Sequence, residues 1–335
     1  MKNTKKLLIA ALILILTLVL AACGGGDSED TGETTDTSTG EGTEEVAKDS
    51  DEQLVFGFTC MTMNNPFFQV HEENVREVVE ANGDKLITMD PQLDVSLQIN
   101  QVEDMISQGI DAIFLNPVDW EGIRPALVML EEAGIPIINF DTEVKDFEYV
   151  TAYVGSDNYH AGFVAGEDMK ERLPEGGKIA VLDTPTMNSI NDRIEGFFDA
   201  IEGHPFEVVS QQNGEHTLEL ALEITEDVLI ANPDIVAIMA GNDPMALGAL
   251  AAAKAANNQD VIIYSVDGSP EAKAEIAEGS QLVGTGAQSP IQIGQISAEV
   301  AYKIMNGEEY DEITPVETFL ITEENVDEYG VDGWQ

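Results

Sequence analysis

The chain has 335 residues, of which 63 are acidic and 15 are lysine or arginine, so its formal net charge at pH 7 is −48. A field of this sign repels nucleic acid and acidic ligands, which excludes functions that depend on binding either. The acids occur in every segment rather than in a tail. We interpret this as adaptation to salty or alkaline surroundings, with an ordinary acidic exported protein as the alternative.

The start of the chain predicts an export signal. A lysine-rich start precedes the apolar run 7–22, and small residues follow. This pattern is typical of a secretory signal rather than of a membrane span. Its end, Leu20-Ala21-Ala22-Cys23, resembles the lipobox of bacterial lipoproteins. The resemblance implies that residues 1–22 are removed and that Cys23 carries lipid, which anchors the protein to the cell membrane outside the cytoplasm. An uncleaved anchor is the alternative.

Residues 23–53 are predicted to form a disordered acidic spacer. Asp, Glu, Thr, Ser and Gly dominate this segment, and it has no apolar period. Such a composition cannot bury enough surface to order itself. The spacing of a calcium-binding loop is absent from it. We therefore expect a solvated leash between the lipid and the folded part of the chain.

From about Leu54 onward, strand-like and helix-like segments alternate. The strand-like segments are short continuous apolar runs, as expected for parallel sheets with helices on both faces. Strands are expected at 54–60, 85–89, 112–116, 136–140, 149–154, 178–182, 207–210, 235–239, 261–266 and 282–284. Helices are expected near 68–79, 95–108, 121–133, 158–172, 190–201, 218–230, 245–256, 270–277 and 291–305.

About ten such units are too many for one sheet. The rhythm also restarts near residue 150, with a strand, a loop and a long helix. The predicted fold class is therefore α/β, with two Rossmann-like lobes built on parallel sheets. A single closed barrel is the alternative. Cys60 lies in the first strand and has no disulfide partner once Cys23 carries lipid, so we expect an inert buried thiol.

The segment Asn64-Asn65-Pro66-Phe67-Phe68 follows the first predicted strand. Ligands of open α/β sheets bind at this edge, beyond the carboxyl ends of the strands. Aromatic faces stack on C–H groups, and amides donate and accept hydrogen bonds. Together they suit a neutral polyhydroxylated molecule. The alternative is a hydrophobic staple at the helix start with one ring in the core.

Further polar residues stand at later strand ends and near one helix start. They are Asn116, Asp141, Thr142, Arg193, Asn242, Asp267 and Gln288. Carboxylates, amides and one guanidinium can together pair a ring of hydroxyl groups. For Asp119 and Asp243 we expect helix caps instead, since Asp is common at that position.

In their order along the chain, these motifs resemble the ribose-binding branch of the periplasmic sugar-binding proteins, the solute-binding subunits of ABC transporters. The resemblance runs from about Leu54 to about Ile321 and is strongest in the first loop and in the run 242–248. It implies the type I periplasmic binding protein fold, with two lobes joined by a three-crossover hinge. The N-terminal lobe would be 54–155 with 289–316, and the C-terminal lobe 156–288 with 317–335.

The same resemblance assigns roles to single residues. Phe67 and Phe68 would flank the sugar ring. The residues implied to hydrogen-bond its hydroxyls are Asn65, Asn116, Asp141, Arg193, Asn242, Asp267 and Gln288. Three positions depart from ribose binders: Thr142 replaces an arginine, Glu215 or His216 a phenylalanine, and Val266 an aromatic residue. We count Thr142 and His216 among the candidate ligand residues, and we expect a ligand other than ribose, or weak ribose binding.

The predicted function is capture of a neutral monosaccharide or polyol and its delivery to the membrane subunits of an ABC permease. Presentation of the sugar to a chemoreceptor or sensor kinase is the alternative. No nucleophile, metalloprotease or Walker motif occurs, and a glycosidase pair of Asp141 and Asp267 is the enzymatic alternative. We predict a non-enzymatic protein without cofactor or metal, a monomer that binds no nucleic acid.

Overall fold

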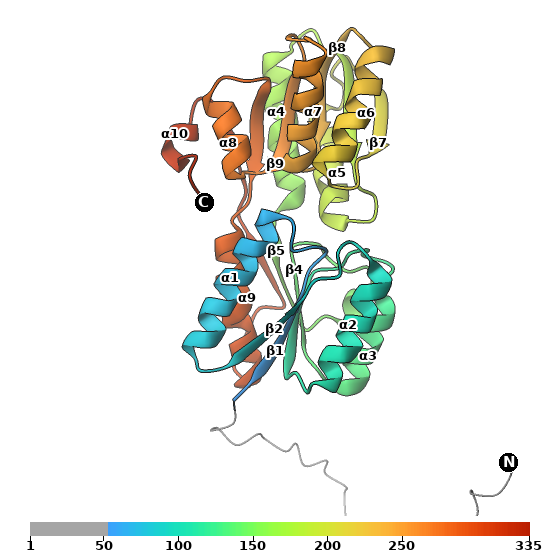
Figure 1. The fold of residues 1–335 in the computed structure, drawn as a ribbon. Coiled ribbons are helices and arrows are strands. Elements are labelled where there is room, and N and C mark those ends of the chain that lie inside the picture. Colours follow the sequence, from blue (N-terminus) through green and yellow to red (C-terminus); the bar gives the residue numbers. More distant parts are fainter. Residues whose placement is uncertain (1–52) are drawn as a thin grey trace, which may run out of the picture. The chain divides into compact units, whose positions relative to one another are not determined.

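The computed structural model describes residues 53–335, and Figure 1 shows two sheets, each with helices on both faces. Cys23, the predicted signal and all but the last residue of the predicted spacer lie outside the described residues. The chain passes between the two sheets three times, after β5, after β10 and after β11. Among residues 53–335, no helix is long and apolar enough to cross a membrane.

The first sheet has the strand order β11-β5-β4-β3-β1-β2, and the strand pairs are parallel. Its strands are β1 (Val55–Thr59), β2 (Lys85–Met89), β3 (Ala112–Leu115), β4 (Ile137–Phe140), β5 (Ala152–Ser156) and β11 (Ile313–Val316). Its helices are α1 (Pro66–Ala81), α2 (Val95–Ser107), α3 (Arg124–Ala133) and α9 (Pro290–Met305), with a short 3-10 helix, η1 (Phe147–Tyr149). In Figure 1, α1 and α9 cover one face, and α2 and α3 the other. We call this unit the first lobe.

The second sheet has the order β12-β10-β9-β8-β6-β7, parallel except for the antiparallel pair β10–β12. Its strands are β6 (Gly177–Asp183), β7 (Phe206–Asn213), β8 (Ile235–Ala240), β9 (Ile262–Asp267), β10 (Leu282–Ala287) and β12 (Phe319–Thr322). Its helices are α4 (Asn158–Arg172), α5 (Asn188–Ile201), α6 (Leu218–Ala231), α7 (Asp243–Ala255), α8 (Pro270–Ala277) and α10 (Val326–Tyr329). We call this unit the second lobe. The predicted two-lobed α/β fold is confirmed, and the closed barrel is wrong.

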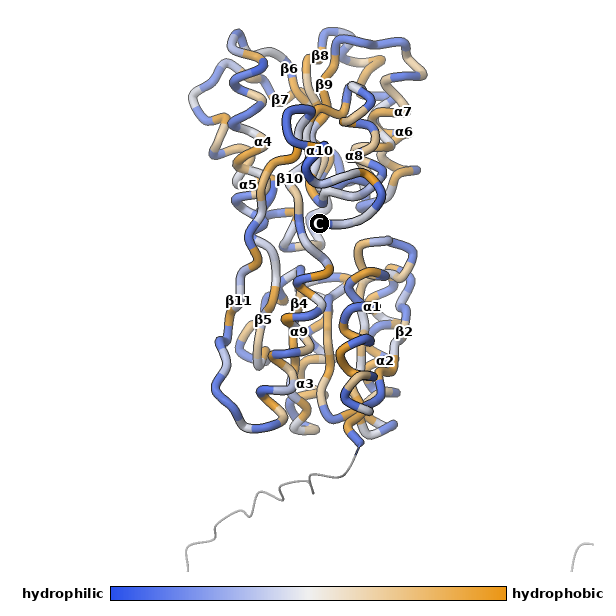
Figure 2. The backbone as a smooth tube through the Cα atoms, turned by 90° about the vertical axis from the view of Figure 1, so that its left-hand side faces the viewer, coloured by the Kyte–Doolittle hydropathy of each residue, from blue (hydrophilic) through white to orange (hydrophobic). Residues whose placement is uncertain are grey.

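Continuous apolar strands form the core of each lobe. In the first lobe, Phe56, Phe58, Phe114 and Phe140 are fully buried, as strands covered on both faces require. Figure 2 shows hydrophilic loops at the outer ends of both lobes, where the chain turns in solvent. Cys60 is buried and free, and burial raises the pKa of its thiol, as expected for an inert core residue.

Strand register brings the loops that carry the candidate residues to one edge. Thr59 of β1 pairs with Leu115 of β3, and Leu115 pairs with Asn139 of β4. The residues that follow these strands therefore emerge side by side. One predicted helix start was early: α3 begins at Arg124, because Asp119 accepts the backbone N–H groups of a preceding turn. Asp119 thus caps a turn rather than the helix itself.

Candidate functional site

A small cavity of about 20 Å³ lies between the two lobes. Its lining residues are Met61, Asn65, Phe67, Phe68, Asp141, Met187, Ile190, Arg193, Asn242, Asp267 and Gln288. Eight of these eleven residues were predicted from the sequence as ligand-binding. Three other predicted residues, Asn116, Thr142 and His216, do not line this cavity.

The start of α1 places the two adjacent phenylalanine rings. Asn65 is the N-cap of α1, and its side-chain oxygen accepts the Phe67 backbone N–H at 3.0 Å. Pro66 follows at the first helical position, where its missing N–H costs nothing. The two rings meet edge to face at 5.3 Å. Phe68 also contacts the core ring of Phe140, at 6.4 Å, so the ring of Phe68 bridges cavity and core.

Asp141 follows β4 and presents its carboxylate to the cavity. Its Oδ2 accepts from the Asn116 side-chain amide at 3.1 Å and from the Thr142 hydroxyl at 3.3 Å. Asn116 therefore supports the carboxylate from behind instead of lining the cavity. Burial raises the pKa of Asp141 to about 6, although Arg193 and these hydrogen bonds oppose the shift.

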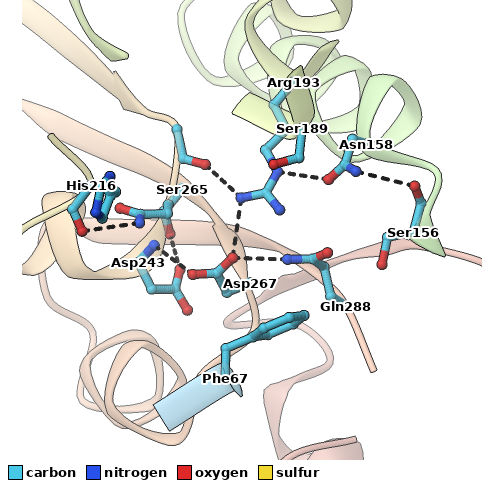
Figure 3. A network of polar contacts seen from close by, with 12 residues as sticks. Phe67, Ser156, Asn158, Ser189, Arg193, His216, Asp243, Ser265, Asp267 and Gln288 are labelled. Atoms are coloured by element: carbon cyan, nitrogen blue, oxygen red, sulfur yellow. Dashed lines mark hydrogen bonds and ion pairs between the residues drawn. The ribbon is translucent and has the colours of Figure 1, made fainter. Parts of the chain in front are cut away.

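Arg193 projects from α5 between the two candidate carboxylates, and Figure 3 shows it at the centre of a polar network. Its Nε donates to Asn158 at 2.8 Å, and its Nη1 donates to the Gly241 carbonyl at 2.8 Å and to Asp267 at 3.2 Å. Its Nη2 lies 4.0 Å from Asp141 of the other lobe. A side chain at Gly162 of α4 would collide with the Arg193 backbone, so this close helix approach requires glycine.

Asp267, at the end of β9, is the acceptor at the centre of the second lobe's network. Its Oδ1 accepts from Arg193 and from the Gln288 amide at 2.9 Å, and its Oδ2 accepts the Asp243 backbone N–H at 3.2 Å. The pKa of Asp267 is raised by burial, and nearby Asp243 adds to the shift while Arg193 opposes it. The buried Gln288 Oε1 has no partner among the described residues, which leaves an acceptor at the cavity.

The predicted cap role of Asp243 is wrong. Asn242 caps α7, with its Oδ1 accepting the Met245 N–H at 3.0 Å. Asp243 is instead fully buried and accepts from the hydroxyl of Ser265, the N–H of Ser269 and the hydroxyl of Thr285. This buried carboxylate braces the loop that carries Asp267, because each of its partners adjoins that loop in space.

Three of the seven non-glycine residues that have positive φ in the described part of the chain are candidate residues. Asp141 has φ of +59°, Asp267 of +148° and His216 of +50°, values that non-glycine residues rarely adopt. Such conformations cost free energy and persist where the surrounding structure holds them. The backbone at these three positions is therefore held by the surrounding structure, which fixes the direction of the three side chains.

Thr142 and His216 lie beside the small cavity rather than in it. The Thr142 hydroxyl is 2.7 Å from the Ser189 hydroxyl of the second lobe, a contact between lobes.

His216 lines an adjoining cavity of about 420 Å³, and neither ring nitrogen has a partner among the described residues. Burial lowers the pKa of His216 to about 4, so the ring is neutral at physiological pH. Val266 is buried in β9 and lines neither cavity.

The arrangement offers aromatic faces on one wall and fixed donors and acceptors on the other. Within residues 53–335, no cluster of three or more His, Cys, Asp or Glu side chains could hold a metal ion. The aromatic faces and the fixed donors and acceptors suit recognition of hydroxyl groups by stacking and hydrogen bonds.

Comparison with known proteins identifies the family. The sequence profile described as periplasmic binding protein domain matches residues 56–309. The ribose import binding protein of Escherichia coli is 31% identical over 264 residues, which cover 78% of this chain and 88% of that protein. The chain belongs to the periplasmic binding protein family.

Two solved structures of this family are similar in fold and sequence. An ABC transporter solute-binding protein from Mycobacterium smegmatis with bound glycerol has a TM-score of 0.80 and 32% identity, covering 84% of this chain and 99% of that one. A second, from Bacillus halodurans C-125 with bound myo-inositol, has a TM-score of 0.78 and 33% identity, covering 83% and 97%. These comparisons confirm the sugar-binding branch of the family that was recognised from the sequence. The family consists of solute-binding proteins, so the chain is not an enzyme and the glycosidase alternative is wrong.

Some lining residues of this periplasmic binding protein were missed from its sequence. Met61 directly follows the predicted strand 54–60, and its position at that strand end was a signal that could have found it. Met187 and Ile190 lie around the start of α5, where apolar residues read as core. Trp334 lines the adjoining cavity from the far end of the chain, and no local pattern marks it.

Proposed function

We propose that the protein captures a neutral monosaccharide or polyol between its two lobes and delivers it to an ABC permease in the membrane. One observation carries the proposal: the Arg193–Asp267–Gln288 network of the second lobe faces Phe67 of the first lobe across the cavity (Figure 3). The relatives support a sugar, since one is named for ribose import and the solved neighbours hold glycerol and myo-inositol. All three are neutral and carry several hydroxyls.

In this proposal the ligand contacts are the residues that line the small cavity. Asp141 and Asp267 accept hydrogen bonds from sugar hydroxyls, Arg193 and the amide groups of Asn65 and Asn242 donate, and the free Gln288 Oε1 accepts. Phe67 and Phe68 stack on the C–H groups of the ring. Asn116 and Thr142 act indirectly, by holding the Asp141 carboxylate.

Entry of a sugar requires the two lobes to separate. The cavity of about 20 Å³ has room for about one or two water molecules. The lobes meet around this cavity. There the backbone N–H of Trp120 donates to the Thr186 carbonyl at 3.1 Å, and the Thr142 hydroxyl contacts the Ser189 hydroxyl. Ligand release must break these contacts, so they stabilise the closed arrangement of the lobes.

Calorimetry over a panel of pentoses, hexoses and polyols tests the function. We expect saturable binding of at least one neutral sugar or polyol, with no turnover, and weaker binding of ribose than of the preferred ligand. A thermal-shift screen can rank the panel first, because a ligand at a hundred times its Kd stabilises the fold by about 2.7 kcal/mol. Binding of an amino acid or peptide without any sugar response would contradict the proposal.

We further propose that lipid on Cys23 holds the protein outside the cell membrane, with residues 23–53 as a spacer. The lipobox-like end of the apolar run supports this, and the periplasmic location of the family supports an extracytoplasmic site. Expression of the full chain and of Cys23→Ala in bacteria provides the test. We expect the first in the membrane fraction and the second released; equal fractionation of both would contradict the anchor.

A further inference from the structure

The cavity that adjoins the small polar cavity is far larger. It has about 420 Å³ against about 20 Å³. The two cavities share Asn65 of the first lobe and Asp267 of the second. The larger space therefore gives a sugar that contacts the residues of the polar cavity room to extend past these two residues.

Trp334 supplies an aromatic wall of that larger space. Its ring stands edge to face with Phe67 at 5.7 Å, so a residue of the second lobe touches the aromatic platform of the first. Phe67, Phe68 and Trp334 are the phenyl or indole rings among the residues that line the two cavities, and Trp334 alone of these comes from the second lobe. The indole thus lines the larger space next to the Phe67 ring that it contacts.

The segment that carries Trp334 is fastened to the site on both sides of the indole. The buried Lys273 of α8 donates to the Gly333 carbonyl at 2.6 Å and to the Gln335 side-chain oxygen at 3.0 Å. The Gln335 amide in turn donates to the backbone carbonyls of Gln288 and Asp267, two residues that line the polar cavity.

The backbone beside Asp267 is shaped to receive this segment. Gly268 has φ of +77°, and any side chain there would collide with the Gln335 amide. A left-handed glycine leaves room for the hydrogen bond between Gln335 and the Asp267 carbonyl. The segment is therefore fitted against the loop that presents the candidate carboxylate.

We propose that residues 333–335 are part of the ligand site, and that Trp334 packs on the portion of the sugar that extends beyond the polar cavity. The inference rests on the proposed function and deepens it, because it makes Trp334 a determinant of ligand size and retention. A ligand with more C–H surface toward Trp334, such as the carbocycle of myo-inositol or the six-carbon skeleton of D-allose, gains more from the indole than the five-carbon D-ribose does.

Binding of D-ribose, D-allose and myo-inositol to wild type, Trp334→Ala and Trp334→Phe tests the proposal. For whichever of the three binds wild type most tightly, we expect Trp334→Ala to raise Kd roughly tenfold, mainly through faster dissociation, and Trp334→Phe to retain most of the affinity. Tyr329→Ala is the matched control: it removes a ring that stacks on Phe319 at 4.6 Å and lines neither cavity. We expect wild-type Kd for this variant.

Fluorescence gives a second readout that does not depend on a stability change. The chain has two tryptophans, so Trp120→Phe leaves Trp334 as the sole indole. We expect its emission to shift as the same sugar saturates the protein. Unchanged Kd and dissociation rate in Trp334→Ala, with clear sugar binding by wild type, would overturn this inference and leave the proposed function standing. A wild type that binds none of the three sugars, and no other neutral sugar or polyol, would overturn both.

Discussion

The two lobes present different walls to the same cavity. The first lobe offers two phenylalanine rings on α1 and a single carboxylate, Asp141, held by Asn116. The second lobe offers a connected network in which Arg193, Asp267 and Gln288 are already joined by hydrogen bonds. The second wall is thus fixed in geometry before a ligand arrives, and the first is mainly an apolar surface.

The contrast indicates a division of labour in recognition. Fixed hydrogen-bonding groups discriminate strongly, because an analogue that lacks the matching hydroxyl leaves them unpaired. Aromatic surface adds affinity with less demand on hydroxyl position. We therefore expect variants of the second wall to change which sugar binds, and variants of the first wall to change how tightly sugars bind in general.

Removal of the Arg193 side chain should have the largest effect. Arg193→Ala leaves two buried carboxylates, Asp141 and Asp267, without their shared cation, and should weaken sugar binding by about 2–5 kcal/mol. Calorimetry with the best ligand of the panel measures this loss. Arg172→Ala is the control, because Arg172 pairs with Asp168 at a partly exposed site on α4. Wild-type affinity in Arg193→Ala would place Arg193 outside the ligand contacts.

The Asp141 carboxylate of the first wall should make the stability of the protein depend on pH. The pKa of Asp141 in the folded protein is about 6, above the ordinary value of 3.8. Because the folded protein binds this proton more tightly than the unfolded chain does, protonation of Asp141 stabilises the fold at pH values below 3.8. This stabilisation is lost as the pH rises through about 6. From about pH 4 to about pH 8, Asp141→Asn should therefore gain about 2–3 kcal/mol of stability relative to wild type.

Urea unfolding of the sugar-free protein at several pH values measures that trend. The informative quantity is how the difference in unfolding free energy between the two proteins changes with pH. Its absolute size is less informative, because the substitution also removes a partner of Arg193. Asp260→Asn, at an exposed position, controls for the loss of one charge. A difference between Asp141→Asn and wild type that stays flat with pH would show that the carboxyl titrates in its ordinary range.

The same contrast explains how far sequence reasoning reached. Short continuous apolar runs indicated both sheets. The expectation that ligand residues follow strand ends located Asn65, Asp141, Asp267 and Gln288, which line one cavity. This expectation could not show that Asn116 also holds the Asp141 carboxylate, because that contact joins the ends of two different strands. Nor could it assign Asp243, because a cap and a buried brace have the same residue type at the same place.

Contacts between segments that are distant in the chain could not be predicted from sequence patterns. Trp334 reaches the site through hydrogen bonds of its neighbours to Lys273, about sixty residues earlier in the chain. Thr142 was read as facing the sugar, and the structure places its hydroxyl against Ser189 of the other lobe. The Thr142 side chain therefore contributes to the contact between the lobes.

Truncation of the aromatic platform should have a smaller effect than loss of Arg193. Phe67→Ala should raise Kd by roughly tenfold for every sugar that binds, since stacking is worth about 0.5–1.5 kcal/mol beyond area burial. The ratio of Kd values between sugars should stay nearly constant. Phe67→Leu, which keeps apolar volume without a ring, is the matched control. A changed preference among sugars would break the proposed division between the walls.

Acidic side chains are spread over both lobes, so the stability of the whole fold should respond to salt. At a net charge of −48, self-repulsion opposes the compact state. The Debye length falls from about 10 Å at 0.1 M to about 3 Å at 1 M salt. We expect the Tm to rise by several degrees over this range in sodium chloride, as differential scanning calorimetry would show. A flat or falling Tm would argue against the adaptive interpretation of the acids.

The hydroxyl contact between Thr142 and Ser189 should have the smallest effect, and it joins the two walls directly. Thr142→Val and Ser189→Ala each remove one partner of the 2.7 Å contact. Both partners are buried, and in the proposed function the contact breaks when the lobes separate. Each variant should therefore weaken sugar binding by about 0.5–1.5 kcal/mol through loss of closed-state stability. Because one hydrogen bond is removed in both cases, the double variant should cost little more than either single one.

A double-mutant cycle on sugar binding measures this coupling. Fully additive losses would show that the two hydroxyls act separately, with Thr142 working through its hydrogen bond to the Asp141 carboxylate instead.

The dissociation rate also distinguishes a role of Thr142 in the contact between lobes from a role in supporting Asp141. Loss of the contact between lobes should speed dissociation of every bound sugar alike, because opening of the lobes precedes release. Loss of support for Asp141 should act most on sugars whose hydroxyl donates to that carboxylate. Stopped-flow dissociation rates for two sugars of the panel separate these outcomes, and only the first keeps Thr142 as a link between the walls.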